Sequence, residues 1–156
     1  KEDILLYFFR MWSLRRSVEL VHKPKEGLAG IHYLFDKLSE ACEEHPGLWL
    51  SLVGYLADFK RSPKPFPIKP EEKKLVFPEI TNINTIEILS LDQMLEKFAL
   101  EAIFKKEITK SINTRDITNL LLTIFLGGIT IAHVNHLSPL KIFFRRNVDL
   151  MLNGLN

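Results

Sequence analysis

Apolar side chains recur at intervals of three and four residues along most of the chain, which is the spacing that gathers them on one face of a helix. The pattern predicts helices near residues 4–21, 28–44, 48–59, 85–102, 116–134 and 139–155. In the first of these, Leu5, Phe9 and Trp12 form a second apolar strip, so we expect the first half of this helix to be covered on two sides. No alternating strand pattern occurs. The sequence therefore predicts an all-α protein, a bundle of about six helices.

Local signals mark several of the helix ends. Pro46 and Gly47 end the second helix and start the third, residue 113 or 114 caps the fifth, and Ser138 followed by Pro139 opens the last. The spacing of Ser90 and Gln93 is that of a capping box, which places an alternative start of the fourth helix later than residue 85.

Residues 61–84 interrupt the helical pattern with five prolines between Pro63 and Pro78. Proline lacks a backbone donor and fixes φ, so neither a long helix nor a central strand fits this segment. We expect an extended surface loop. The alternative is a proline-rich ligand for a partner domain, although no motif with basic flanks stands out.

From Ile117 to Leu140 the chain contains no aspartate, glutamate, lysine or arginine. Such a run suits a membrane span, a buried core helix, or a surface that another chain covers. A span needs about 20 predominantly apolar residues, whereas the dense apolar part here, from Leu120 to Ala132, is shorter and is interrupted by two glycines. We therefore expect a buried helix and no membrane association.

Length, charge and cysteine content narrow the class of protein. The 156 residues suit one compact domain, and the net charge of +2 is too small to indicate a nucleic-acid-binding surface. The single cysteine excludes an internal disulfide and favours a reducing compartment. No signal peptide is visible, so we expect a cytoplasmic protein. Because the chain begins at Lys1, we also expect further residues in front of it.

Few residues suggest catalytic or metal chemistry. Glu19 and His22 have the Glu-x-x-His spacing of di-iron bundles, but the second such pair that these sites need is missing. His133 and His136 lack a nearby carboxylate or thiol, and histidines commonly end helices. Cys42 lies on an apolar stripe, as a core residue does. Without a phosphate loop or a nucleophile elbow, the sequence predicts no enzyme, no metal and no cofactor.

Three segments, in this order, resemble the C-terminal part of TetR-type (tetracycline-repressor-like) transcriptional regulators. "KEDILLYFF" at Lys1 is similar to the start of the helix that follows the DNA-binding domain in that family. "FALEAIFKKEITKSINTRDITNLLLTIFLGG", from Phe98, resembles a stretch of the family's C-terminal domain in which a short turn joins two helices, the second with a mid-helix glycine. "NVDLMLNGL" resembles the family's last helix. "EHPGLW" also fits the family's short helices. One departure is Lys106, where the family often has glycine, which leaves the tightness of that turn open.

The resemblance implies that residues 1–156 form the ligand-binding and dimerisation domain of a repressor. The helix-turn-helix domain that binds operator DNA would precede Lys1, so no residue of this chain is expected to contact bases. The last two helices would pair with their copies across a two-fold axis as a four-helix bundle. The interface residues expected on this basis are Leu121, Ile124, Phe125, Gly128, Ile131, Phe143, Leu150 and Met151.

The family's ligand pocket lies inside the bundle, so the resemblance also suggests where a small effector binds. Small-molecule pockets are mostly apolar with a few polar groups, and we expect a bulky apolar effector. The candidate ligand-binding residues are Met11, Trp12, Tyr33, Trp49, Tyr55, Met94, Phe98, Asn119 and Thr123. The alternative function is a stand-alone helical binding or interaction module without a DNA-binding role.

Overall fold

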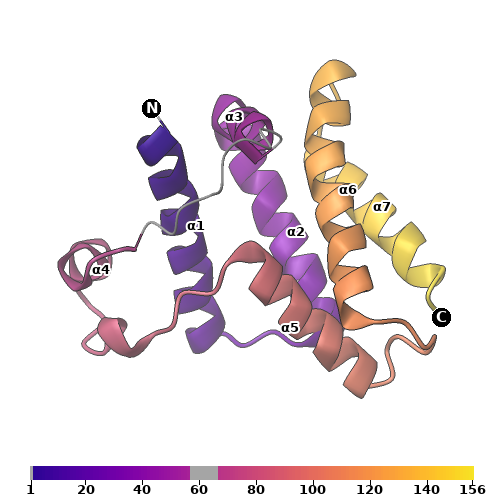
Figure 1. Ribbon diagram of the computed structural model, residues 1–156, viewed down its shortest axis with the longest axis horizontal. Coiled ribbons are helices and arrows are strands. Elements are labelled where there is room, and N and C mark those ends of the chain that lie inside the picture. The colour runs from indigo at the N-terminus through magenta and orange to yellow at the C-terminus, as the bar shows by residue number, and fades with distance from the viewer. Residues whose placement is uncertain (1, 57–66) are drawn as a thin grey trace.

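The computed structural model describes residues 2–56 and 67–156 (Figure 1). Those residues form seven α-helices and one 3₁₀ turn, with no strand among them, and so the all-α prediction is confirmed. The elements are α1 (Glu2–His22), α2 (Gly27–Glu44), α3 (Pro46–Leu56), α4 (Pro70–Val76), η1 (Ile83–Thr85), α5 (Leu91–Phe104), α6 (Thr114–Val134) and α7 (Leu140–Asn153). The predicted extension of the third helix to Phe59 lies outside the described residues.

Helix α2 occupies the centre of the molecule and packs against α5 on one side and α7 on another (Figure 1). A Cβ atom at Gly30 would lie 2.3 Å from Cδ1 of Phe98, so only glycine allows α2 and α5 to approach this closely. The inward face of α2 is fully buried and carries Ile31, Leu34, Phe35 and Leu38. These side chains belong to the main core of the protein.

The amino-terminal end of α2 is held by the carboxyl-terminal end of α5. The backbone N–H of Gly27 donates to Glu101 Oε2 at 3.1 Å, and that of Leu28 donates to Glu107 Oε2 at 2.9 Å. Two carboxylates thus satisfy unpaired donors of the helix and lie at the positive end of its dipole. Gly27 has φ of +54°, and a Cβ atom there would lie 2.1 Å from Glu107 Oε2.

The turn after α5 is tight even though lysine and not glycine occupies its left-handed position. Lys106 adopts the left-handed conformation with φ of 58°. Its N–H donates to Ile103 O at 3.0 Å, and the N–H of Glu107 donates to Ala102 O at 2.9 Å. This pair of bonds is the Schellman motif, which normally places glycine at the left-handed position. Lysine at this left-handed position therefore strains the turn, but the hydrogen bonds of the turn are still formed.

Polar contacts along its length fasten α7 to α2. Arg145 binds the Asp36 carboxylate through Nε and Nη2 at 2.8 and 2.6 Å, and Lys141 Nζ lies 3.1 Å from the same group. Burial of Asp36 favours a higher pKa, but the hydrogen bonds from Arg145 and Lys141 outweigh it and hold the pKa of this carboxyl below its ordinary value. Farther along, His32 Nε2 lies 3.4 Å from Asp149 Oδ1. These links join two helices separated by about a hundred residues of sequence.

The expectation of an extended loop over residues 61–84 is wrong for the part that the structure describes. Residues 67–90, here called the arm, contain α4 and η1, which lie on the side of α1 that faces away from α2 in Figure 1. Pro70 is the first residue of α4, a position where proline is favoured, and Glu72 Oε2 accepts from the backbone N–H of Lys69 at 2.7 Å. Proline at this position starts a short helix instead of preventing one.

The arm is packed onto α1 through a second, smaller core. Leu14 and Val18 of α1 are buried there together with Ile68, Ile83 and Ile86 of the arm. Leu5 and Trp12, on another side of α1, belong to the main core. The helix is therefore covered on two sides, but the second cover lies on its carboxyl-terminal half. The prediction that the first half is covered on two sides is wrong, because Ile4 is 70% exposed.

The predicted helix ends are close to those observed. Ser90 caps α5, with its N–H donating to Gln93 Oε1 at 2.9 Å, so the capping box and not residue 85 marks the start. Asn113 Oδ1 accepts from the N–H of Arg115 at 2.8 Å at the start of α6. Helix α7 begins at Leu140, one residue later than predicted.

Helix α6 contains most of the uncharged run, from Ile117 to Val134, and among the described residues it is the one helix long and apolar enough to cross a membrane. One face of it belongs to the core, where Ile117, Leu121, Phe125 and Ile129 are buried. Gly128 is buried on the same helix, against α7. This arrangement is compatible with a soluble protein.

Candidate functional site

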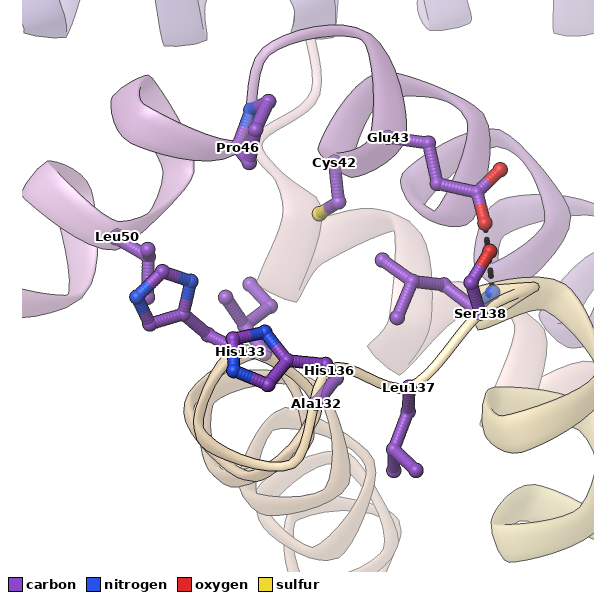
Figure 2. Close-up of a pocket in the computed structure, with 11 residues that line it drawn as sticks. Cys42, Glu43, Pro46, Leu50, Ala132, His133, His136, Leu137 and Ser138 are labelled. Carbon is purple, nitrogen blue, oxygen red and sulfur yellow. Dashed lines mark hydrogen bonds between the residues drawn. The ribbon is translucent and has the colours of Figure 1, made fainter.

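A cavity of about 480 Å³ lies where the end of α2, the start of α3 and the end of α6 meet (Figure 2). The connection from α6 to α7 closes another side of it. The residues that line the cavity are Cys42, Glu43, Pro46, Leu50, Ile129, Ala132, His133, His136, Leu137, Ser138 and Leu140. Its volume falls within the range of roughly 300–1,000 Å³ that is typical of small-molecule sites.

The cavity has an apolar interior and a polar rim. Cys42, Ile129 and Ala132 are buried, and Leu50 of α3 is half-buried. His133 and His136, in contrast, are exposed at the end of α6. Figure 2 shows the Cys42 thiol pointing into the space between α2 and the end of α6. Such a site can bury an apolar body while its rim offers hydrogen-bonding groups to one polar end.

His136 reaches the rim because α6 ends in a second Schellman motif. The N–H of His136 donates to His133 O at 3.4 Å, and that of Leu137 donates to Ala132 O at 2.9 Å. His136 has φ of 52°, in the left-handed region that side chains other than glycine rarely adopt. A non-glycine residue in this conformation is strained, and such strain is concentrated at functional sites.

Glu43 fixes the opposite side of the rim. Its Oε1 atom accepts a hydrogen bond from the backbone N–H of Leu140 at 2.7 Å, as drawn in Figure 2. This carboxylate lies at the positive end of the α7 dipole and satisfies a donor that the helix leaves unpaired. The last turn of α2 is thereby tied to the first turn of α7, which holds the α6–α7 connection in place over the cavity.

Cys42 is the one cysteine of the chain, and its thiol lines the cavity. Burial, with a smaller effect from the charge of Glu43, raises the pKa of the Cys42 thiol to about 12. The thiol is therefore neutral at physiological pH, whereas a nucleophilic cysteine requires the thiolate. Within residues 2–56 and 67–156, no group of three or more histidine, cysteine, aspartate or glutamate side chains is placed to hold a metal ion.

None of the nine ligand-binding residues predicted from the sequence lines this cavity. Trp12 and Trp49 pack edge to face in the main core, with ring centroids 5.7 Å apart. Met94 and Phe98 are also buried there, beside a smaller cavity, and Tyr55 is half-buried on α3. The structure does not bring these side chains together at one site.

The remaining predicted ligand residues are spread over other surfaces. Met11 lines a groove between α1 and α2 that Trp12 also reaches, and Tyr33 lines a separate cavity beside the arm. Asn119 and Thr123 are exposed on α6, where Thr123 Oγ1 donates to Asn119 O at 2.8 Å. They face solvent because the helical repeat carries them away from the buried face of α6. Their assignment to an internal pocket is therefore corrected.

Some of the predicted interface residues are buried within the chain, and others are exposed. Leu121, Phe125 and Gly128 are buried within their own chain, so no partner reaches them. Ile131 and Leu150 are exposed, which leaves them available to another chain. The partly buried members are Ile124, Phe143 and Met151. The apolar surface of α6 and α7 exists, but its composition differs from the predicted set.

The polar residues of the rim were not predicted to form a site, because the sequence suggests only a weak metal pair for His133 and His136 and a helix cap for Ser138. Glu43, His133, His136 and Ser138 come from the ends of two helices that are far apart in the chain. The available signal was the cluster of polar residues that directly follows the long uncharged helix. A cluster at a helix end commonly reflects capping alone, so only the folded arrangement shows that it borders a cavity.

Comparison with known proteins adds no relative from which a function transfers. No family model matches the chain, and no curated protein or solved structure is detectably similar to it. The function has to be inferred from the cavity, the surface of the helices and the motifs in the sequence.

Proposed function

We propose that this chain is the effector-binding and dimerisation domain of a TetR-like transcriptional regulator. Its effector, a small and largely apolar molecule, would occupy the cavity between α2, α3 and α6. The observation that carries this proposal is the form of that cavity, with a buried apolar interior and a rim of His133, His136 and Glu43. Protein sites for small ligands combine these two features.

The surface of the last two helices supports the dimeric part of the proposal. Six of the twelve large apolar side chains that are exposed in the described residues lie between Leu120 and Leu150. Ile131 is 51% exposed on α6 and Leu150 is 63% exposed on α7. An uncovered apolar surface of this kind promotes association. We propose that a second copy of the chain covers it around a two-fold axis.

Gly127 lies within this surface. It stands seven residues after Leu120 and four before Ile131, so the three share one side of α6. A Cβ atom at Gly127 would meet no other atom within 4 Å, which leaves an open backbone surface for close approach of another helix. The glycine that suits an intersubunit contact is therefore Gly127, whereas Gly128 serves a contact within the chain.

Binding to operator DNA would belong to a helix-turn-helix domain in front of Lys1, as the resemblance implies. The net charge of +2 of this chain suits a sensor domain that does not itself contact DNA. The same weak charge suits the alternative function, a stand-alone helical binding module. The sequence encoded upstream of Lys1 separates the two, because a regulator requires a helix-turn-helix domain there.

Thermal unfolding with a library of small apolar compounds tests the sensor role. A compound that binds only the folded protein and is present at about one hundred times its Kd adds about 2.7 kcal/mol to the free energy of unfolding. We expect Leu50→Trp, which fills the cavity, to abolish the shift. Leu56→Trp makes the same change at an exposed position of α3 outside the cavity, and should preserve it. Equal shifts in both variants would place the ligand elsewhere.

A further inference from the structure

A second cavity, of about 560 Å³, lies between the end of α1, the middle of α2 and the arm. It is separate from the cavity of Figure 2, because no residue lines both. The residues that line it are Val18, Glu19, His22, Lys23, Lys25, Tyr33, Lys37, Phe77, Glu79 and Ile80. Apolar and basic side chains occur together among them.

The apolar side of this second cavity continues the small core between α1 and the arm. Val18 is buried in that core, and Phe77 and Ile80 are partly buried against it. Phe77 is the first residue after α4, and Ile80 comes three residues after Phe77. A hydrocarbon chain lying here would contact both α1 and the arm, so its binding would join the two.

The basic side of the cavity retains uncompensated positive charge. Glu19 is engaged by Arg16 Nη2 at 2.9 Å and by the hydroxyl of Tyr33, which donates to its carboxylate. Lys37 Nζ is paired with Glu40 Oε2 at 2.6 Å.

Lys23 and Lys25 make no ion pair with any residue in the described part of the chain. Of the acids that line the cavity, only Glu79 is left to oppose them. Lysine ammonium groups bind carboxylate and phosphate through charge-assisted hydrogen bonds. The lining therefore pairs an apolar wall with a cationic rim.

We propose that this second cavity binds an anionic amphiphile, a medium-chain carboxylate or alkyl phosphate. Lys23 and Lys25 bind the anionic head, and Val18, Phe77 and Ile80 contact the hydrocarbon chain. The Figure 2 cavity has the opposite character, since Glu43 is the one formally charged residue that lines it. The two cavities therefore select ligands of different charge.

Isothermal titration calorimetry with octyl phosphate and with octanoate tests this site, using octanol and octyltrimethylammonium as comparators. We expect one molecule of either anion to bind per chain, and the two comparators to bind much more weakly. The double variant Lys23→Gln/Lys25→Gln should weaken octyl phosphate binding by about tenfold or more, because two charge-assisted hydrogen bonds are lost. Phe77→Ala should weaken it by shortening the apolar wall.

Two control variants test whether octyl phosphate binds specifically in the second cavity. Lys74→Gln/Lys106→Gln makes the same change of charge at exposed residues outside the cavity and should bind octyl phosphate as the wild type does. Leu50→Trp, which fills the other cavity, should also leave this binding unchanged. Hydrogen exchange of residues 77–80 should slow when octyl phosphate is bound. Equal affinity for octanol, no binding of either anion, or loss of binding in Leu50→Trp would overturn the proposal.

Discussion

A Cβ atom placed on Gly128 would lie 2.6 Å from Cε1 of Phe144 in the same chain, and 3.2 Å from Cε1 of Phe143. The absence of a side chain at this position lets α7 pack directly on the backbone of α6. A glycine in the interior of a helix costs about 1 kcal/mol relative to alanine, so it is retained where packing requires it. Here that requirement arises within one chain.

Gly128→Ala should lower the free energy of unfolding by about 1–3 kcal/mol, because the added methyl group overpacks the contact with Phe144. Chemical denaturation measures this change. Gly54→Ala is the matched control, since a Cβ atom there meets nothing within 4 Å. The control should stabilise the protein by up to about 1 kcal/mol. A neutral or stabilising Gly128→Ala would show that α6 and α7 are less closely packed than described.

Gly127→Arg should convert the proposed dimer into a monomer. The arginine would introduce an unpaired charge into an apolar contact, which is strongly unfavourable when water is excluded. Light scattering coupled to gel filtration gives the mass directly. Gly54→Arg, an identical change at another open helical glycine, should remain dimeric. A wild-type chain that is monomeric at micromolar concentration, or a dimeric Gly127→Arg, would contradict the proposed interface.

Lys106→Gly should raise the free energy of unfolding by about 0.5–1 kcal/mol, since glycine adopts the left-handed conformation without steric cost. The gain arises from φ of 58° at this residue. Lys106→Ala serves as the control, because alanine retains the steric cost and removes only an exposed charge. Urea denaturation of the three proteins distinguishes them. Equal stability of the glycine and alanine variants would mean that the turn is unstrained.

The buried thiol of Cys42 should make stability depend on pH in the alkaline range. Its pKa is raised by burial from 9.0 to about 12, so the unfolded chain ionises first as pH rises. The stabilising contribution is complete below about pH 9 and is lost between pH 9 and 12. Free energies of unfolding measured at pH 8 and 10.5 should therefore fall more in the wild type than in Cys42→Ala. Parallel losses in the two proteins would show that the thiol is accessible to water.

The helices of the main core were predictable because their signals are local. The 3-4 spacing of Ile31, Leu34, Phe35 and Leu38 places them on one face, and that face is fully buried. Capping is also local, and the residues that cap α5 and α6 were identified from the sequence. Helix α4 was not predicted, because the five prolines of residues 61–84 together argue against a helix there, whereas Pro70 stands at a first helical position that favours proline.

The cavities were not predictable because they depend on contacts between distant segments. Cys42 and Ile129 each lie on the apolar face of a helix, and neither pattern shows that the two residues border the same cavity. The aromatic residues that suggested a ligand site instead fill the core, as Trp49 does against Trp12 and Phe125. A residue's type indicates that it is buried, whereas the packing of its neighbours determines whether a space remains beside it.

The hydrogen bonds between α2 and α7 determine which helix a ligand in the cavity of Figure 2 would move. Glu43 with Leu140 and Asp36 with Arg145 tie α7 to α2 through hydrogen bonds, whereas α6 packs on α7 through the contact of the Phe125 and Phe144 rings and the backbone of Gly128. We therefore expect a ligand that fills the cavity to move the end of α6 relative to α2 and α7. In the proposed two-fold dimer the same movement would occur in both copies, and we expect it to change the contact between the outer faces of the two α6 helices.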